Sequence, residues 1–142
     1  MPTTAKWQPT PAQGRYHAAL RELGCVITGE KLNTQLHHVI GASGRHNKLW
    51  IGQWWVILAR ADLHDSRLGA PYNLTDHKAV FEERFGSQKS VYMRQNYMLI
   101  GAVAMGHIKF DLADMPPAAE LEAINSYAVS YTHLTLPTIY SV

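Results

Sequence analysis

The stretch LNTQLHHVIGASGRHNKLWIGQWWVILARADLH, residues 32–64, carries the pattern that decides the predicted fold. Leu32 to Val39 is a candidate strand that ends in the pair His37-His38. Residues 41–48, GASGRHNK, follow as a loop rich in glycine and basic side chains. We therefore expect a strand that ends in two adjacent histidines and leads into a basic loop.

The second half of the stretch completes a strand–strand–helix unit. Trp50 to Leu58 is rich in aromatic and β-branched residues, which favour a strand or a packed extended segment. Ala61 to Leu68 predicts a short helix that ends at Gly69. Two strand candidates followed directly by a helix predict a small α+β core, and further helices are expected to flank it.

The flanking sequence supplies these helices. Thr10-Pro11 offers an N-cap and a first-turn proline to a helix that ends at Gly24. Cys25 to Thr28, closed by Gly29, is short and β-branched and predicts a strand and turn. The later helices are expected after Thr75 or Asp76, with Val80, Phe81 and Phe85 on one face, over Ser87 to Met105, and after Pro116-Pro117.

Length and composition set the domain organisation. A chain of 142 residues with 46% apolar residues suits one domain with a hydrophobic core. We expect residues 1–9 to form a loose arm and residues 10–128 to form that domain. Residues 129–138, VSYTHLTLPT, match the translation of a transposon-based sequencing adapter. We therefore interpret residues 129–142 as a non-native tail, with the native C-terminus lost near Ala128.

The composition also excludes several classes of protein. A single cysteine excludes a disulfide scaffold and a four-cysteine zinc site. No apolar run approaches about 18 residues, and the N-terminus lacks the apolar core of a secretory signal, so we expect no membrane partner and a cytoplasmic location. The net charge of +2 excludes a polybasic tail and is compatible with a small nucleic-acid enzyme.

Eight histidines are the unusual feature of the composition. Neighbouring residues of a strand point to opposite faces, so His37 and His38 cannot easily share one metal ion. They can divide the work, with one histidine binding a metal ion and the other reaching a substrate. His64 follows on the predicted short helix and adds an imidazole of the kind that suits a divalent metal.

The order of these motifs resembles that of the HNH endonucleases, most closely the phage-encoded HNH proteins related to recombination-enhancement nucleases. The resemblance covers residues 15–95 and rests on GCVITG at 24–29, His37-His38, Gly44, WVIL at 55–58, Leu63-His64 and FEERFG at 81–86. It implies a ββα-metal core, in which a histidine pair ends a β-hairpin and a last histidine lies on the next helix. It also implies a phage enzyme that hydrolyses DNA phosphodiester bonds in the host cytoplasm during recombination or DNA processing, with a recombinase as a candidate partner.

The resemblance assigns roles to individual histidines. His37 and His64 match the metal ligands of the family, and His38 matches its general base. His77 is a further candidate ligand, with a solvated histidine in a first helical turn as the alternative. The implied cofactor is one divalent ion per site, Mg²⁺, Mn²⁺ or Zn²⁺. A neutral imidazole with an ordinary pKa near 6.5 suits a base at cellular pH.

The DNA contacts are expected to be electrostatic. Arg45, Lys48 and Arg60 are the candidate phosphate-binding residues. The tryptophans at 50, 54 and 55 are expected in the core under the hairpin, and base stacking is the alternative.

The sequence departs from the family pattern at several positions. The central Asn of the family has no assigned counterpart, Thr28 stands where the family has a second cysteine, and no cysteine follows Leu58. A structural zinc ion is therefore not expected. These departures favour an alternative reading, a catalytically impaired HNH-fold DNA-binding or recombination-accessory protein. A third reading is a structural phage protein whose histidines bind no metal.

Overall fold

The computed structural model describes residues 8–64, 74 and 78–127 of the chain. These residues form a mixed α+β structure, which confirms the predicted α+β class. The predicted helix end at Gly69, the cap at Thr75 or Asp76, the candidate ligand His77 and the tail 129–142 lie outside the described residues. The elements are α2 (Pro11–Leu23), β1 (Thr34–His38), β2 (Arg45–His46), β3 (Leu49–Trp50), β4 (Val56–Arg60), α3 (Ala61–His64), α4 (Lys78–Phe85), α5 (Gln88–Ala104), the 3₁₀ turn η2 (Leu112–Asp114) and a helix over 118–127.

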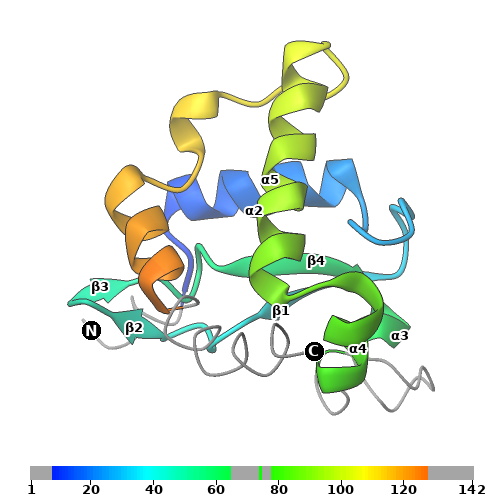
Figure 1. Cartoon of the computed structure of the whole chain (residues 1–142). Coiled ribbons are helices and arrows are strands. Elements are labelled where there is room, and N and C mark those ends of the chain that lie inside the picture. The colour runs from blue at the N-terminus through cyan, green and yellow to red at the C-terminus, as the bar shows by residue number, and fades with distance from the viewer. Residues whose placement is uncertain (1–7, 65–73, 75–77, 128–142) are drawn as a thin grey trace.

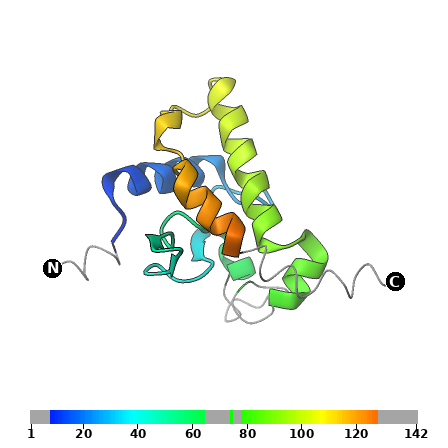
Figure 2. The same ribbon diagram turned by 60° about the vertical axis from the view of Figure 1, so that its left-hand side comes forward.

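The central pairing joins β1 and β4 in antiparallel register. Thr34 lies opposite Arg60, and His38 lies opposite Val56. Residues 56–59 of β4 are completely buried, so this strand runs through the core. The β2–β3 hairpin lies at one end of the β1–β4 pair, whereas α3 and α4 lie at the other end (Figures 1 and 2).

The basic loop over residues 41–48 was expected to be irregular, and the structure corrects this expectation. Arg45–His46 and Leu49–Trp50 pair as a second, two-stranded sheet. Asn47 and Lys48 form its turn with φ angles of 52° and 66°. Positive φ at both central residues is typical of the tight turn that matches the twist of a hairpin, and Asn tolerates it well.

A single strand over Trp50 to Leu58 was also wrong, because the chain turns at residues 52–54. The N–H groups of Ile51 and Gly52 both donate to the Gly44 carbonyl oxygen, at 3.0 and 3.1 Å. A Cβ atom on Gly52 would lie 2.1 Å from the carbonyl oxygen of Gly41, so only glycine fits there. This close approach of two loop segments separates β3 from β4.

The strand expected over Cys25 to Thr28 is a turn instead. The N–H of Cys25 donates to the Glu30 carbonyl, and the N–H of Gly29 donates back to the Cys25 carbonyl, so the segment closes on itself. One hydrogen bond, from Val26 N–H to the Leu58 carbonyl, attaches it to β4. The positive φ angles of Gly24 and Gly29 allow this return of the chain.

The helices follow the sequence signals closely. Thr10 caps α2 through a reciprocal pair of hydrogen bonds with Gln13, and Gly24 ends the helix. Ser87 caps α5, and the last helix follows Pro116-Pro117 as expected. None of the described helices combines the length and the apolar character that crossing a bilayer requires.

The core forms where α2 and α5 pack above β4 (Figure 1). Its largest fully buried side chains include Tyr16 and Leu20 from α2 and Tyr92 and Leu99 from α5. The Tyr92 hydroxyl donates to the Trp54 carbonyl at 2.9 Å, so the helix is tied to the segment that enters β4. On α4, only Phe81 of the expected face is buried, whereas Val80 is exposed.

Gln95 of α5 is completely buried and binds the backbone of β4. Its Oε1 accepts the N–H of Leu58 at 2.8 Å, and its Nε2 donates to the Val56 carbonyl at 3.0 Å. The side-chain amide therefore satisfies backbone hydrogen-bonding groups on this edge of β4, as the backbone of a neighbouring strand would. Buried backbone groups need such partners, because leaving them unpaired costs free energy.

Replacing Gln95 should therefore destabilise the whole fold. Gln95→Leu keeps the volume but removes both hydrogen bonds, and we expect the free energy of unfolding to fall by roughly 2–4 kcal/mol. The measurement is denaturant unfolding followed by circular dichroism. Tyr97→Ala on the exposed side of the same helix is the control and should change the stability by less than about 0.5 kcal/mol. Equal losses in the two variants would contradict the role of Gln95.

Candidate functional site

Two of the predicted metal ligands lie side by side. The rings of His37 on β1 and His64 on α3 have centroids 5.2 Å apart and planes inclined at 67°. His37 Nε2 lies 3.0 Å from Oε1 of Gln88, and His64 Nδ1 lies 2.6 Å from Oε1 of Gln35. An amide oxygen only accepts hydrogen bonds, so each of these ring nitrogens donates. In the neutral rings, the lone pairs are then on His37 Nδ1 and His64 Nε2.

The environment of His37 keeps this ring neutral. Burial, followed by the proximity of His64, lowers the pKa of His37 from 6.5 to about 4. Metal ions bind the neutral imidazole, because the protonated ring has no lone pair to offer. His37 is therefore ready to act as a ligand at neutral pH without first losing a proton.

His38 has a separate set of partners, as expected from alternation along the strand. Its Nε2 lies 2.9 Å from Oε1 of Gln53, in the turn before β4. His17 of α2, which is buried, stands edge-on to His38 with ring centroids 6.4 Å apart and bonds the Gln53 carbonyl through Nε2 at 2.7 Å. Because the Gln53 amide oxygen accepts, His38 donates from Nε2 and keeps its lone pair on Nδ1. Gln53 thus fixes both the orientation and the tautomer of His38.

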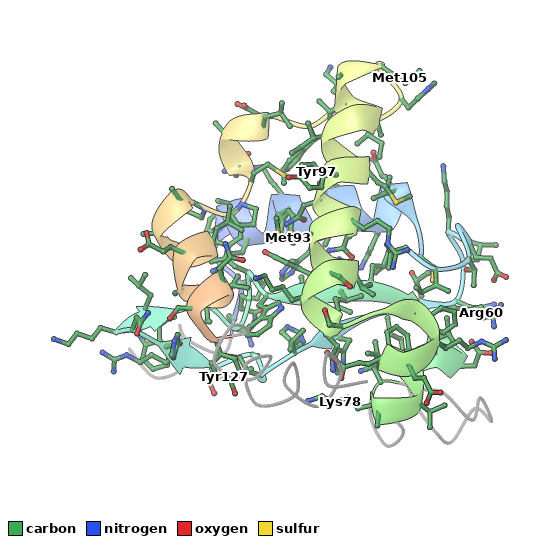
Figure 3. The ribbon with its side chains drawn as sticks, in the orientation of Figure 1. Arg60, Lys78, Met93, Tyr97, Met105 and Tyr127 are labelled. Atoms are coloured by element: carbon green, nitrogen blue, oxygen red, sulfur yellow. The ribbon has the colours of Figure 1, made fainter. Side chains whose placement is uncertain are left out.

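A cavity of about 540 Å³ brings these groups to one place. His37, His38 and His64 all line it, together with Lys78 at the start of α4. Figure 3 shows Lys78 beside the lower end of α4. Its ammonium group is close enough to His37 to contribute to the lowered pKa of that ring. The cavity therefore combines imidazoles with a positive charge, a combination suited to a phosphate-containing ligand.

The donor set fits a divalent metal ion bound by two protein ligands. His37 and His64 are neighbouring imidazoles, and one nitrogen of each ring donates to a glutamine oxygen. Such outer partners fix the ring orientation of metal-binding histidines. Within residues 8–64, 74 and 78–127, no group of three His, Cys, Asp or Glu side chains gathers around one point. Further ligands would be water or substrate oxygens, or a residue such as His77 outside the described ranges.

The predicted phosphate-binding residues lie in two different places. Arg45 and Lys48 are exposed on the β2–β3 hairpin. The guanidinium carbon of Arg45 lies 5.1 Å from the centroid of the Trp50 ring. Trp50 is 39% exposed, so its expected burial in the core is wrong, whereas Trp54 and Trp55 are buried as expected.

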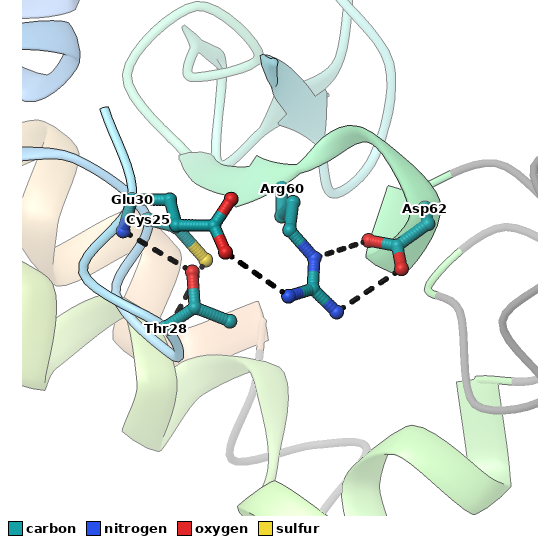
Figure 4. Close-up of polar contacts among 5 residues, drawn as sticks. All are labelled: Cys25, Thr28, Glu30, Arg60 and Asp62. Atoms are coloured by element: carbon teal, nitrogen blue, oxygen red, sulfur yellow. Dashed lines mark hydrogen bonds and ion pairs between the residues drawn. The ribbon is translucent and has the colours of Figure 1, made fainter. Parts of the chain in front are cut away.

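Arg60 is held by carboxylates of its own chain (Figure 4). Its Nε and Nη2 donate to Asp62 at 2.6 and 3.0 Å, and its Nη1 donates to Glu30 at 3.3 Å. Asp62, followed by Glu30, raises the pKa of Arg60. The positive charge is thus balanced inside the fold, where it ties the end of β4 to the turn after α2. We therefore restrict the proposed phosphate contacts to Arg45 and Lys48.

Sequence reasoning missed the glutamines that organise the site. Gln35 lies two residues before His37 and so shares its face of β1, which alternation alone indicates. Gln53 and Gln88 reach the histidines from distant segments, and no local motif marks them. In comparisons with protein-family models, curated proteins and solved structures, nothing matched this chain.

The depressed pKa of His37 makes the stability depend on pH. Between pH 6.5 and about 4 the unfolded chain binds a proton at His37 and the folded chain does not, so stability falls as the pH falls. We expect His37 to account for roughly 2–3 kcal/mol of the loss between pH 7 and pH 4.5. Denaturant unfolding in the presence of a chelator measures it.

Two variants separate this contribution from those of the other histidines. His37→Gln should reduce the pH dependence, whereas His107→Gln, at an exposed position, should leave it unchanged. The same pH dependence in wild type and His37→Gln would show that His37 protonates as easily in the folded chain as in the unfolded one.

Proposed function

We propose that this chain is a metal-dependent DNA endonuclease of the HNH type, with a ββα-metal core made by β1, β4 and α3. The observation that carries the proposal is the pairing of His37 with His64 beside a separately oriented His38. Support also comes from the order of the elements, an antiparallel strand pair that leads directly into a helix. The proposed setting is phage DNA recombination or processing in the host cytoplasm.

In the proposed site, His37 and His64 would hold one divalent ion, Mg²⁺, Mn²⁺ or Zn²⁺. When bound, such an ion supplies positive charge that stabilises a phosphate group under attack. Lys78 adds a second positive charge to the same cavity. Arg45 and Lys48 on the neighbouring hairpin would contact backbone phosphates, which gives salt-sensitive binding with little sequence preference.

His38 is the proposed general base. Its Nδ1 accepts a proton from water while the water oxygen bonds to phosphorus, and the P–O bond to the leaving oxygen breaks with its electron pair on that oxygen. Gln53 is the proposed positioning residue, because its amide oxygen holds the proton on His38 Nε2 and so leaves Nδ1 to act. In this scheme Gln53 takes over the task of orienting the base, for which the sequence offers no central Asn.

A catalytically impaired DNA-binding protein is the second candidate. The observation that favours it is that only two candidate ligands, His37 and His64, come together within the described part of the chain. Metal-dependent nicking of supercoiled plasmid by the purified chain decides between the two functions, because the second predicts binding without cleavage.

The two neighbouring histidines should fail in different ways. His38→Ala should keep its metal affinity and cut the rate of plasmid nicking by about 10²–10⁴, the usual contribution of a positioned base. His37→Ala should bind Mn²⁺ at least about tenfold more weakly, and excess Mn²⁺ should restore part of its activity. Titration calorimetry and a nicking assay measure the two effects.

His107→Ala is the matched control, since this histidine is exposed and distant from the cavity in the chain. It should match the wild type in both assays. Full nicking activity in His38→Ala, prepared free of host nucleases, would remove His38 from the mechanism. Equal losses of metal affinity in all three variants would show that no defined site exists.

A further inference from the structure

A second cavity, of about 440 Å³, lies beside the β2–β3 hairpin, and the proposed hydrolysis does not take place in it. Trp50 and Lys48 of the hairpin line it, and Gln53 and Trp54 line it from the turn before β4. Ala42 lines this cavity and also the histidine cavity, so the two hollows are neighbours.

Different side chains in and beside this cavity suit a nucleobase and the phosphates of a nucleic acid. Trp50 offers an indole ring that is 39% exposed, and aromatic rings stack on nucleobases whatever their identity. Glu120 also lines the cavity. Its carboxylate repels a phosphate but accepts a hydrogen bond from an exocyclic amino group. The positive charges of Arg45 and Lys48 lie at the exposed surface of the same hairpin, where a backbone would run.

The β2–β3 hairpin places Arg45 and Trp50 next to each other. Arg45 lies opposite Trp50 in the β2–β3 register, and its guanidinium lies over the indole ring, 5.1 Å from the ring centroid. Arginine in this position adds a cation to an aromatic platform, which strengthens binding to single-stranded nucleic acid. The tight turn at Asn47 and Lys48 fixes the direction in which both strands project.

We propose that this cavity binds one unpaired nucleobase, stacked on Trp50, while Arg45 and Lys48 hold the adjoining phosphates. The base-binding site has a consequence for the choice of substrate, and this consequence rests on the proposed nuclease function. DNA with an unpaired nucleotide, such as a single-stranded tail or a branch, is then preferred over intact duplex. Cleavage is expected close to the unpaired base, because Ala42 lines both cavities.

The test compares two single strands of about twelve nucleotides, a length within the usual site size. One is oligodeoxycytidine, and the other is an abasic strand with the same number of phosphates. Fluorescence anisotropy with the full chain in a chelator measures binding without cleavage. The wild type should bind the cytidine strand about tenfold or more tightly than the abasic strand, in the range expected for stacking of one base.

Variants assign the preference to individual residues. Trp50→Ala should bind the two strands equally and keep the wild-type affinity for the abasic strand, whereas Trp50→Phe should keep most of the preference. Arg45→Ala should weaken the binding of both oligonucleotides. It should also reduce the slope of log affinity against log salt concentration by about one unit. Tyr97→Ala, an exposed aromatic residue on α5, is the control and should match the wild type. Thermal unfolding checks that each variant is folded.

The outcomes distinguish this inference from the proposed function. A cytidine preference that survives in Trp50→Ala, or its absence from the wild type, overturns the base-binding cavity even if the enzyme nicks plasmid. A Trp50-dependent preference in a chain that never cleaves DNA supports the cavity and contradicts the nuclease. Metal-dependent cleavage mapped beside an unpaired nucleotide, and lost from that position in Trp50→Ala, supports both.

Discussion

The buried amide of Gln95 is the contact on which the rest of the structure depends. It joins α5 to the backbone of β4 through a donor and an acceptor at once, so the helix can lie in only one register along the strand. β4 in turn pairs with β1 along its other edge. The position of His37 and His38 on β1 is therefore fixed, through β4, by a side chain that has no part in the proposed chemistry.

The same helix also reaches the candidate site directly. Gln88 in the first turn of α5 accepts from His37, two turns before Gln95 meets β4. Gln35 and Gln53 do the same for His64 and His38. Each histidine thus has an amide oxygen on one ring nitrogen, which selects the tautomer and orients the ring. Hydrogen bonds of this kind restrict the rotamers of the three histidine side chains.

The sequence predicted the features that depend on local signals. The N-cap of α2, the end of that helix at Gly24 and the extent of α5 all follow from residues adjacent in the chain. The strand character of the His37 segment and of the 56–58 segment followed from their patterns, whereas their pairing was implied by the family resemblance. The closeness of His37 and His64 was expected from a family resemblance, and the described geometry is compatible with it.

The features that sequence reasoning missed depend on contacts between distant segments. The close contact between the segments of Gly44 and Gly52 interrupts the expected strand. Nothing in the local sequence of either glycine predicts this contact. No sequence motif marks a glutamine that will bind a distant group. The hydrogen bonds of Gln53, Gln88 and Gln95 could therefore not be predicted. Arg60 was predicted to bind phosphate. The sequence did not show that Asp62 and Glu30 would both bind its guanidinium group in the folded chain.

The central claim is that His37 and His64 act together as ligands of one divalent ion. The most direct measurement is nuclear magnetic resonance of the histidine ring nitrogens during titration with Zn²⁺, which is diamagnetic and keeps the signals visible. We expect His37 Nδ1 and His64 Nε2 to shift together and to saturate at one ion per chain, while the His107 ring is unaffected. Shifts in only one of the two rings, or similar weak shifts in all histidines, would contradict a shared site.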